Sequence, residues 1–298
     1  MAIRPDALRV AAPAKINLNL HVTRKRPDGY HDLQSLVAFA DVGDVLVLER
    51  SAEFSLVIDG PFAGGLAGDA DNLILKAARA LAPRLSTAAQ FRLTKNLPVA
   101  SGIGGGSADA AAAFRGLLAL DGKDFAAADG LGALAATLGS DIPVCLDSAT
   151  AWMEGRGEMV TRLPALPATH IVLVNPGVSV ATADVFRRLV IREGEAVLAP
   201  PPAFRSMQDL VGYLRTTRND LEAPALAVAP VIGTALAALE RSGALFVRMS
   251  GSGATCFGLF ENATDAQSAA FAIGKAQPAW WSRAGQLAAP EFAIPTRI

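Results

Sequence analysis

Polar and apolar side chains alternate strictly in the segment Lys15–Val22, which reads KINLNLHV. Alternation with a period of two is typical of a strand with one buried face, so we predict a strand over 9–22. Lys15, Asn17 and Asn19 then share one face of that strand. Three further strands complete an opening sheet that we predict to be antiparallel: 33–39, 45–49 and 54–58.

The remaining pattern separates into helical and extended regions without a regular alternation of the two. Helical periodicity predicts helices over 72–81 (with Asp71 as the cap), up to Leu120, and over 125–138, 181–190, 206–215, 229–239 and 265–275. Apolar runs predict strands over 149–153, 158–163, 170–175, 244–249 and 255–260. This segregation predicts the α+β class. The proline-bearing stretch 163–167 is the predicted boundary between two domains, 1–165 and 166–298.

A glycine-rich loop joins a predicted strand to an alanine-rich helix at residues 98–112, which read PVASGIGGGSADAAA. Backbone N–H groups without side chains around them can enclose an anion, and the start of a helix points its positive end the same way. Ser107 and Asp109 stand where the helix would be capped. We therefore predict a phosphate-binding loop in preference to a flexible connection.

Two common phosphate loops do not match this segment. A Walker A loop requires G-x-x-x-x-G-K-[ST], but no lysine occurs between Lys95 and Lys123. A dinucleotide fingerprint requires G-x-G-x-x-G, and Ser107 or Asp109 stands in place of the third glycine. The loop must belong to a less common class of phosphate site.

Composition excludes several other kinds of protein. Of the 298 residues, 51% are hydrophobic and 18% charged, which is typical of a globular chain, and the net charge of −1 argues against nucleic acid as a partner. The uncharged stretch 223–239 is short for a membrane span and is interrupted by prolines, so we predict a buried helix there. The N-terminus lacks a signal peptide, and Cys145 and Cys256 form no C-x-x-C pair, which favours a cytoplasmic protein.

The motifs that carry this chemistry resemble those of the GHMP kinases, the superfamily of galactokinase, homoserine, mevalonate and phosphomevalonate kinases. PAKINLNL at 13–20, PVASGIGGGSADAA at 98–111 and SGSGATCF at 250–257 are similar to its three motifs. Four further segments are similar to the kinases that act on 4-diphosphocytidyl-2-C-methyl-D-erythritol: RPDGYHDLQSL at 26–36, GSDIPV at 139–144, EGRGE at 154–158 and NPGVSVAT at 175–182.

This resemblance implies a fold and an activity. The fold is the two-domain GHMP kinase fold, with an N-terminal domain like domain 2 of ribosomal protein S5 and a C-terminal ferredoxin-like α/β plait. The activity is ATP- and Mg²⁺-dependent phosphorylation of the 2-hydroxyl of that cytidine diphosphate methylerythritol, in the non-mevalonate isoprenoid pathway. Its partners are small molecules, not nucleic acid or membrane, and the chain is expected to be a monomer or a homodimer.

The resemblance also implies roles for individual residues. Asp141 corresponds to the catalytic base and Lys15 to the catalytic lysine, while Asn17 on the same face is expected to hold substrate. Tyr30 and His31 correspond to residues that contact cytosine, and Phe186 to a second aromatic residue that would clamp the base against Tyr30. The expected ATP-binding residues are Pro98, Val99, Ala100, Ser101, Gly102, Ile103, Gly104, Gly105, Gly106, Ser107 and Ala108.

Some features depart from the family pattern or stay open. Ala100 and Ser101 replace glycines and Ala108 replaces a serine, so one hydroxyl contact is lost. The loop contains no Lys or Arg, so magnesium is expected to balance the phosphate charge, through ligands that the sequence does not name. The loop 250–253 either approaches the substrate phosphates or is a tight turn. A homoserine or mevalonate-type kinase and a catalytically silent relative are the rival interpretations, and the tail 280–298 has no assignment.

Overall fold

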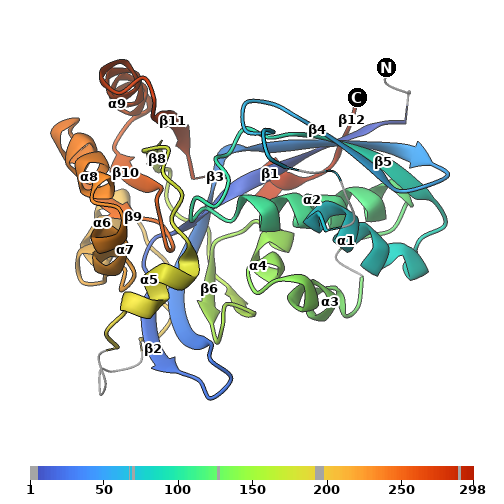
Figure 1. Cartoon of the computed structure of the whole chain (residues 1–298), viewed down its shortest axis with the longest axis horizontal. Helices are drawn as coiled ribbons and strands as arrows, with labels where there is room; N and C mark the ends of the chain where they lie inside the picture. The colour runs from blue at the N-terminus through green and yellow to red at the C-terminus, as the bar shows by residue number, and fades with distance from the viewer. Residues whose placement is uncertain (1–5, 67, 69–70, 126–127, 192–197, 288–289) are drawn as a thin grey trace.

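The computed structural model of the chain describes residues 6–66, 68, 71–125, 128–191, 198–287 and 290–298 (Figure 1). In the described part the strands are β1 (Leu8–Asn17), β2 (His21–Lys25), β3 (His31–Ser51), β4 (Ser55–Asp59), β5 (Ala88–Thr94), β6 (Ala151–Glu154), β7 (Met159–Arg162), β8 (His170–Asn175), β9 (Phe246–Met249), β10 (Cys256–Phe260), β11 (Trp281–Gln286) and β12 (Thr296–Arg297). The α-helices are α1 (Leu73–Leu81), α2 (Gly105–Leu120), α3 (Leu131–Leu138), α4 (Ile142–Asp147), α5 (Thr182–Arg188), α6 (Met207–Arg215), α7 (Glu222–Val228), α8 (Val231–Arg241) and α9 (Ala263–Ala276), with 3₁₀ turns at Ala82–Arg84 and Pro290–Ala293.

The first sheet has the strand order β12-β1-β3-β5-β4, and β2, β6 and β7 extend it through pairing with β3 and with each other. Helices α1 and α2 cover one face of this sheet (Figure 1). Helix α2 packs closely on β3, because a side chain at Gly116 would meet the Leu48 methyl groups at 2.7 and 2.9 Å. The alanines of α2 have the same effect, since small side chains allow a helix to approach a sheet.

The second sheet has the order β11-β8-β10-β9, with every pair antiparallel. Its strands and intervening helices follow the chain order β-α-β-β-α-β, which is the ferredoxin-like plait. Val172 and Val174 face the core formed with α8 and α9, while Ile171 and Leu173 on the opposite face pack toward the first sheet. This topology confirms the predicted C-terminal fold and the α+β class.

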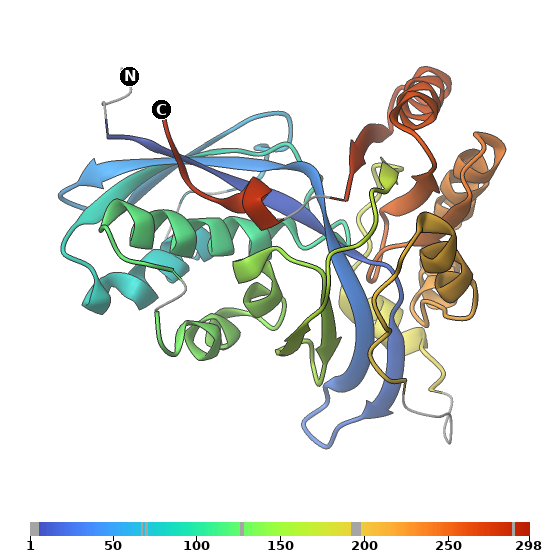
Figure 2. The same cartoon turned by 180° about the vertical axis from the view of Figure 1, so that it is seen from behind.

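The two sheets share a buried core at their junction. Leu36 and Ala38 of β3 lie in one hydrophobic cluster with Leu173 of β8 and Leu210 of α6. The chain then returns to its start, because β12 pairs with the beginning of β1, and Figure 2 shows this terminal segment lying back across the first sheet. The tail that the sequence left unassigned therefore supplies one strand to each sheet.

The strand predictions required three corrections. The strand predicted over 9–22 is interrupted at 18–20, where the Asn19 side chain accepts a hydrogen bond from the Leu36 N–H (2.6 Å) and the Leu20 N–H donates to the Arg218 carbonyl (2.9 Å). The segments 33–39 and 45–49 belong to the single strand β3. The opening sheet is also not purely antiparallel, since β4 runs parallel to β5.

The helix predictions were correct in position but not in their ends. Asn72, not Asp71, caps α1, with its side chain accepting from the Ile74 N–H at 3.0 Å. Helix α2 begins after Gly104, whose backbone has the left-handed conformation. Gly104 is therefore the N-cap, and neither Ser107 nor Asp109 is. Of the helix predicted over 125–138 only α3 is helical among the described residues, and 126–127 lie outside them.

Two short helices were not anticipated. Helix α4 has Pro143 in its first turn, and the apolar stretch 223–239 divides at Ala229–Pro230 into α7 and α8. Proline is tolerated in the first turn of a helix but interrupts an internal one, and helices of six or seven residues have little periodicity to detect.

Candidate active site

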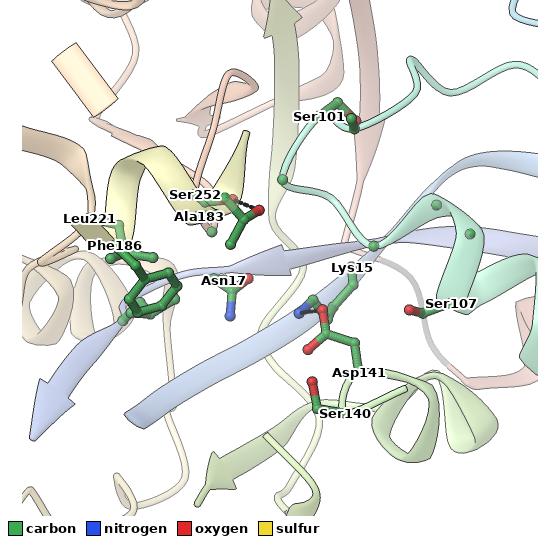
Figure 3. A pocket seen from close by; sticks show the side chains of 18 of the residues that line it. Lys15, Asn17, Ser101, Ser107, Ser140, Asp141, Ala183, Phe186, Leu221 and Ser252 are labelled. Carbon is green, nitrogen blue, oxygen red and sulfur yellow. Dashed lines mark hydrogen bonds and ion pairs between the residues drawn. The ribbon is translucent and has the colours of Figure 1, made fainter. Parts of the chain in front are cut away.

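A cavity of about 1140 Å³ lies between the two halves of the molecule. The first half contributes the end of β1, the tip of the β2–β3 hairpin, the glycine loop and the start of α4, and the second half contributes α5 and the 250–253 turn. Figure 3 shows side chains from both halves directed into this space. The cavity therefore gathers segments that are far apart in the sequence.

Lys15 and Asp141 meet on one wall of the cavity (Figure 3). The Lys15 ammonium lies 2.7 Å from a carboxylate oxygen of Asp141; the lysine side chain is 4% exposed and the aspartate 36%. A register shift between Pro13 and Lys15 marks a bulge in β1, a feature that commonly redirects a side chain near a functional site. Asp141 is the residue before α4, so its carboxylate is held at the start of a helix.

Asn17 lies on the same wall, two residues further along β1. Its side-chain amide donates to the Ser35 hydroxyl at 2.8 Å, and its backbone N–H donates to the Ser250 hydroxyl at 3.1 Å. Asn17 thus faces the cavity while it connects β1 to the 250–253 turn. Asn19, predicted on the same face, is fully buried and bonds to Leu36 instead.

The glycine loop lies directly against Lys15. The Lys15 N–H donates to the Ile103 carbonyl at 3.0 Å, and a side chain at Gly104 would meet the Lys15 Cβ at 3.1 Å. The loop residues that line the cavity are Pro98, Val99, Ala100, Ser101, Gly102, Gly104, Gly105, Gly106 and Ser107. Ile103 and Ala108 are buried in the two hydrophobic cores, so only their backbone groups are available to a ligand. Figure 3 shows the Ser107 hydroxyl directed into the cavity.

The glycine loop packs against the 250–253 turn through backbone atoms. The Ser250 hydroxyl donates to the Gly102 carbonyl at 3.1 Å, and the Thr255 N–H donates to the Ser101 carbonyl at 3.1 Å. A Cβ atom on Gly102 would lie 2.5 Å from the Ser250 carbonyl oxygen and 2.7 Å from that of Gly253. The second glycine loop therefore supports the first one.

We expect Gly102→Ala to weaken nucleotide binding by at least tenfold, because the added methyl would force the two loops apart. Gly102 also has φ +78°, which adds backbone strain of about 1 kcal/mol for a side chain there. Titration with ADP monitored by calorimetry would measure the change. Gly122→Ala is the matched control: it has φ +70° but nothing within 4 Å of the added methyl. Equal losses in both variants would show that strain alone, and not loop packing, is responsible.

A buried ion cluster that the sequence did not reveal lies behind the loop. The Lys95 ammonium contacts Asp44 and, at 2.7 Å, Asp109 of α2, and all three side chains are almost completely buried. The same ammonium would lie 3.1 Å from a Cβ on Gly105. Lys95, which follows β5, therefore places a positive charge behind the loop, but Asp44 and Asp109 already neutralise it.

The carboxyl group of Asp109 has an unusually high pKa. Burial raises its pKa to about 8, although Lys95 acts in the opposite direction, and one of its carboxylate oxygens has no hydrogen-bond partner in the described structure. The cluster contains two aspartates and one lysine, so ionisation of both buried carboxylates would leave one negative charge unbalanced.

This shift predicts a pH dependence of stability. Between pH 4 and 8 native Asp109 holds a proton that the unfolded chain has released, so its contribution to stability decreases as pH rises through that window. Asp109→Asn removes the titration. We therefore expect the free energy of unfolding of wild type, relative to this variant, to fall by about 2 kcal/mol between pH 6 and pH 8. Denaturant unfolding at both pH values would measure it, and parallel pH profiles would contradict the prediction.

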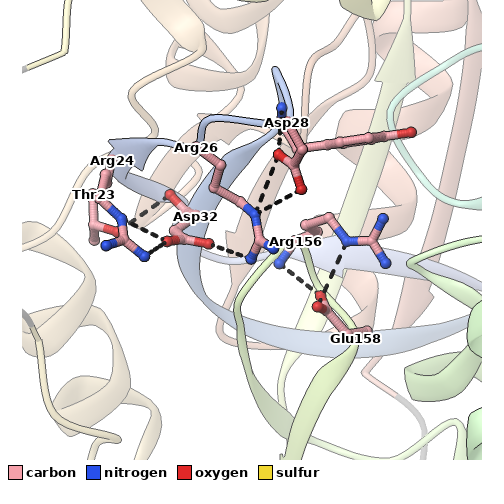
Figure 4. A network of polar contacts seen from close by, with 8 residues as sticks. Thr23, Arg24, Arg26, Asp28, Asp32, Arg156 and Glu158 are labelled. Atoms are coloured by element: carbon pink, nitrogen blue, oxygen red, sulfur yellow. Dashed lines mark hydrogen bonds and ion pairs between the residues drawn. The ribbon is translucent and has the colours of Figure 1, made fainter.

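A network of ion pairs holds the tip of the β2–β3 hairpin (Figure 4). Asp32 accepts from Arg24 (2.9 Å) and from Arg26 (3.1 Å), and these bonds lower the pKa of Asp32, with the Arg24 bond as the largest cause. Asp28 accepts from Arg26 at 3.1 Å and from the Tyr30 N–H at 3.1 Å. The turn that presents Tyr30 to the cavity is thus fixed before any ligand arrives.

The aromatic residues of the cavity make contacts that the sequence did not predict, and the clamp of the base between Tyr30 and Phe186 stays a prediction. Phe186 of α5 stacks on His31, with ring centroids 4.7 Å apart and an interplanar angle of 26°. Tyr30 is 57% exposed and faces the guanidinium of Arg156. Burial lowers the pKa of His31, and the nearby Lys25 adds to this, so the imidazole is neutral at pH 7 and has one nitrogen free to accept a hydrogen bond.

Family models match both halves of the chain. The model "GHMP kinases N terminal domain" matches residues 72–149, and the model "GHMP kinases C terminal" matches residues 202–279. The first match contains the glycine loop and Asp141, and the second contains the 250–253 turn. Together with the cavity, these matches define the class of the protein as a GHMP kinase.

Relatives of known name narrow this class. A 4-diphosphocytidyl-2-C-methyl-D-erythritol kinase of Ruegeria pomeroyi is 51% identical over 283 residues, covering 94% of this chain and 99% of the relative. The kinase of the same name from Paracoccus denitrificans is also 51% identical, over 280 residues, covering 94% of this chain and 97% of its own. The chain belongs to the 4-diphosphocytidyl-2-C-methyl-D-erythritol kinase family of GHMP kinases.

Solved structures agree with this family. A crystal structure of a 4-(cytidine 5'-diphospho)-2C-methyl-D-erythritol kinase is 33% identical, with a TM-score of 0.74, and covers 94% of this chain and 99% of that one. A homoserine kinase from Cytophaga hutchinsonii has a TM-score of 0.68 at 20% identity over 100% of this chain and 99% of its own. That second likeness shows the shared fold alone.

Two kinds of feature are absent from the part of the chain that the structure describes. No helix there combines the length and the apolar character needed to cross a membrane. No group of three or more His, Cys, Asp or Glu side chains there is arranged to hold a metal ion. Cys145 and Cys256 are both buried and free.

Proposed function

We infer that the chain is a small-molecule kinase that transfers phosphate from ATP to the 2-hydroxyl of 4-diphosphocytidyl-2-C-methyl-D-erythritol, giving the 2-phosphate and ADP. This is a step of the non-mevalonate isoprenoid pathway. Family membership over nearly the full chain supports the substrate. The observation that carries the mechanism is the Lys15–Asp141 ion pair, which lies beside the glycine loop in one cavity.

In this proposal Asp141 accepts the proton of the substrate hydroxyl. Phosphoryl transfer requires positioned groups and an acceptor for the alcohol proton. Asp141 is partly exposed to the cavity, as a residue that contacts substrate must be, and the start of α4 holds it in place. Asp141 lies opposite Ser107, so a substrate hydroxyl bound at Asp141 would lie in the same part of the cavity as the glycine loop.

Lys15 supplies the positive charge next to the reacting oxygen. Its ammonium pairs with the Asp141 carboxylate, and it favours the negative charge that develops on the attacking oxygen. Its almost complete burial strengthens these interactions, because water screens them less. Asn17, two residues further on, is proposed to hold the substrate alcohol on the same face.

The glycine loop and the start of α2 are proposed to bind the ATP phosphates through backbone N–H groups. Mg²⁺ typically binds one or two carboxylates together with substrate phosphates, so a site with few protein ligands fits it. The Ser107 hydroxyl, on the cavity lining, is the side-chain group that would hold it together with the substrate phosphates. When bound, the ion would neutralise phosphate charge.

Tyr30 and His31 are proposed to recognise the cytosine, with Phe186 supporting His31 from behind. Neutral His31 can hydrogen-bond the polar edge of a pyrimidine, and the exposed ring of Tyr30 offers a stacking surface.

The two buried thiols suit a reducing compartment, and we propose that the enzyme acts in the cytoplasm.

A coupled ADP-release assay with Mg-ATP tests this function. We expect turnover with the cytidyl substrate and none with homoserine or mevalonate, and Tyr30→Ala should raise KM for the cytidyl substrate. Turnover with another alcohol in its place would keep the kinase and contradict the substrate. Inactivity with all three alcohols would contradict the proposed activity.

A further inference from the structure

The β6–β7 hairpin places a rigid turn on the wall of the cavity beside Asp141. Gly155 and Gly157 both have positive φ, and the Leu33 N–H donates to the Gly155 carbonyl at 2.7 Å, which ties the turn to β3. A side chain at Gly157 would lie 3.5 Å from an Asp141 carboxylate oxygen. The residue between these glycines, Arg156, lines the cavity.

Glu158 holds the base of the Arg156 side chain. It accepts from the Arg156 backbone N–H at 2.6 Å and lies 3.6 Å from Nε. Figure 4 shows both contacts, with the two terminal nitrogens of the guanidinium directed away from Glu158. Within the described chain those terminal nitrogens donate no hydrogen bond, and Glu158 is the one carboxylate that pairs with Arg156, so their donors are available to a ligand.

Three other cations of the cavity are paired with carboxylates. Lys15 and Lys95 are bound to carboxylates as described above, and Arg187 is paired with an aspartate one turn earlier on α5 at 2.8 Å. Lys25 is exposed on the β2–β3 hairpin, whereas Arg156 is held by its turn and by Glu158. Arg156 is therefore a preorganised cation that faces the cavity with free donors.

Arg156 also lies between the two ends of the proposed substrate site. Its guanidinium carbon is 5.0 Å from the centroid of the Tyr30 ring. The next residue, Gly157, lies beside Asp141, since a Cβ atom there would be 3.5 Å from the Asp141 carboxylate. A substrate whose cytosine lies at Tyr30 and whose reacting hydroxyl lies at Asp141 must place its diphosphate between them. Guanidinium groups bind phosphate oxygens through two parallel hydrogen bonds.

We propose that Arg156 binds the diphosphate that links the cytidine to the sugar alcohol, and so makes the site specific for a nucleoside diphosphate conjugate. This inference rests on the proposed function, because it takes the cytidyl substrate as the occupant of the cavity. Arg156 acts in binding and not in the transfer step, so its loss affects KM more than kcat.

Inhibition by CDP and by cytidine, each measured against the cytidyl substrate at saturating ATP, tests the proposal. In Arg156→Ala we expect the inhibition constant of CDP and the KM of the substrate to rise about 30-fold, as loss of a charged hydrogen-bonded contact implies. Cytidine has no phosphate, so its inhibition constant should change by less than about twofold. The Arg156 guanidinium would affect cytidine only indirectly, through its contact with the Tyr30 ring. Arg156→Lys, which keeps the charge but not the fork, should recover part of the CDP affinity.

Arg162→Ala is the matched control, since Arg162 is an exposed arginine on the same hairpin that does not line the cavity. We expect it to leave both inhibition constants unchanged. A parallel loss of CDP and cytidine affinity in Arg156→Ala would overturn the proposal and assign Arg156 to the support of Tyr30, and unchanged constants would overturn it as well. Failure of the proposed function would appear separately, as absence of turnover in the wild-type enzyme.

Discussion

Asp141→Asn is expected to lower kcat by about 10³-fold while the protein stays folded and binds ATP. The substitution keeps the size of the side chain and removes the carboxylate. Among the described residues of the cavity wall, this is the carboxylate next to Lys15 that can accept the hydroxyl proton. General-base catalysis contributes about 10²–10⁴-fold in rate, which sets the size of the effect. Steady-state ADP release gives kcat, and calorimetric titration with ADP reports the nucleotide site.

A double variant sharpens this test. If Lys15 and Asp141 act as one unit, Lys15→Met, Asp141→Asn and the combined variant should lose comparable activity, because residues that act together are not additive. Asp59→Asn removes an exposed aspartate that pairs with Arg92 outside the cavity, and it should keep wild-type kcat. Activity of Asp141→Asn above a tenth of wild type would exclude Asp141 as the base.

Arg115→Met is expected to lower the free energy of unfolding by about 3–5 kcal/mol, because each buried carbonyl left without a donor costs about 1–3 kcal/mol. Arg115 lies inside α2 and is almost completely buried. Its guanidinium donates to four carbonyls in three segments: Ala11 of β1 at 2.8 Å, Cys145 and Leu146 of α4 at 2.7 and 3.1 Å, and Ala293 in the tail at 3.0 Å. Burial lowers the pKa of Arg115 to about 10, which leaves it charged at pH 7.

The loss would leave several buried carbonyls without donors and would loosen the contact between the elements that carry Lys15 and Asp141. Thermal unfolding measures the effect, and for a chain of this size we expect Tm to fall by about 10 °C. Arg92→Met, which removes an exposed arginine paired with Asp59 at 3.0 Å, should change stability by less than about 1 kcal/mol. A similar Tm in both variants would show that the buried carbonyls find other donors.

The positions of the proposed catalytic residues were predictable to a large extent, because the signals for their local structure are local in sequence. The alternation around Lys15, the glycine loop at 98–106 and the turn at Asp141 are each encoded within a few neighbouring residues, since backbone conformation there depends on glycine, proline and side-chain periodicity. The same local signals located most strands and long helices within a few residues.

Features that depend on pairing between distant segments were not predictable in this way. Whether β4 runs parallel or antiparallel to β5 is decided by the sheet, and the tail joins both sheets although its own sequence shows no clear pattern. The interruption at 18–20 is likewise set by partners at Leu36 and Arg218. Strand propensity does not specify the partner of a strand.

The sequence alone determined the class of the protein and the principal groups of its proposed site: Lys15, Asp141 and the glycine loop that we propose binds phosphate. Only the tertiary structure decided which distant groups join them. It placed Lys95 behind the loop, turned Phe186 onto His31, and set Arg156 against Tyr30. The reason is physical: a glycine loop is specified by its own backbone, whereas a contact between side chains depends on the packing that brings two segments together.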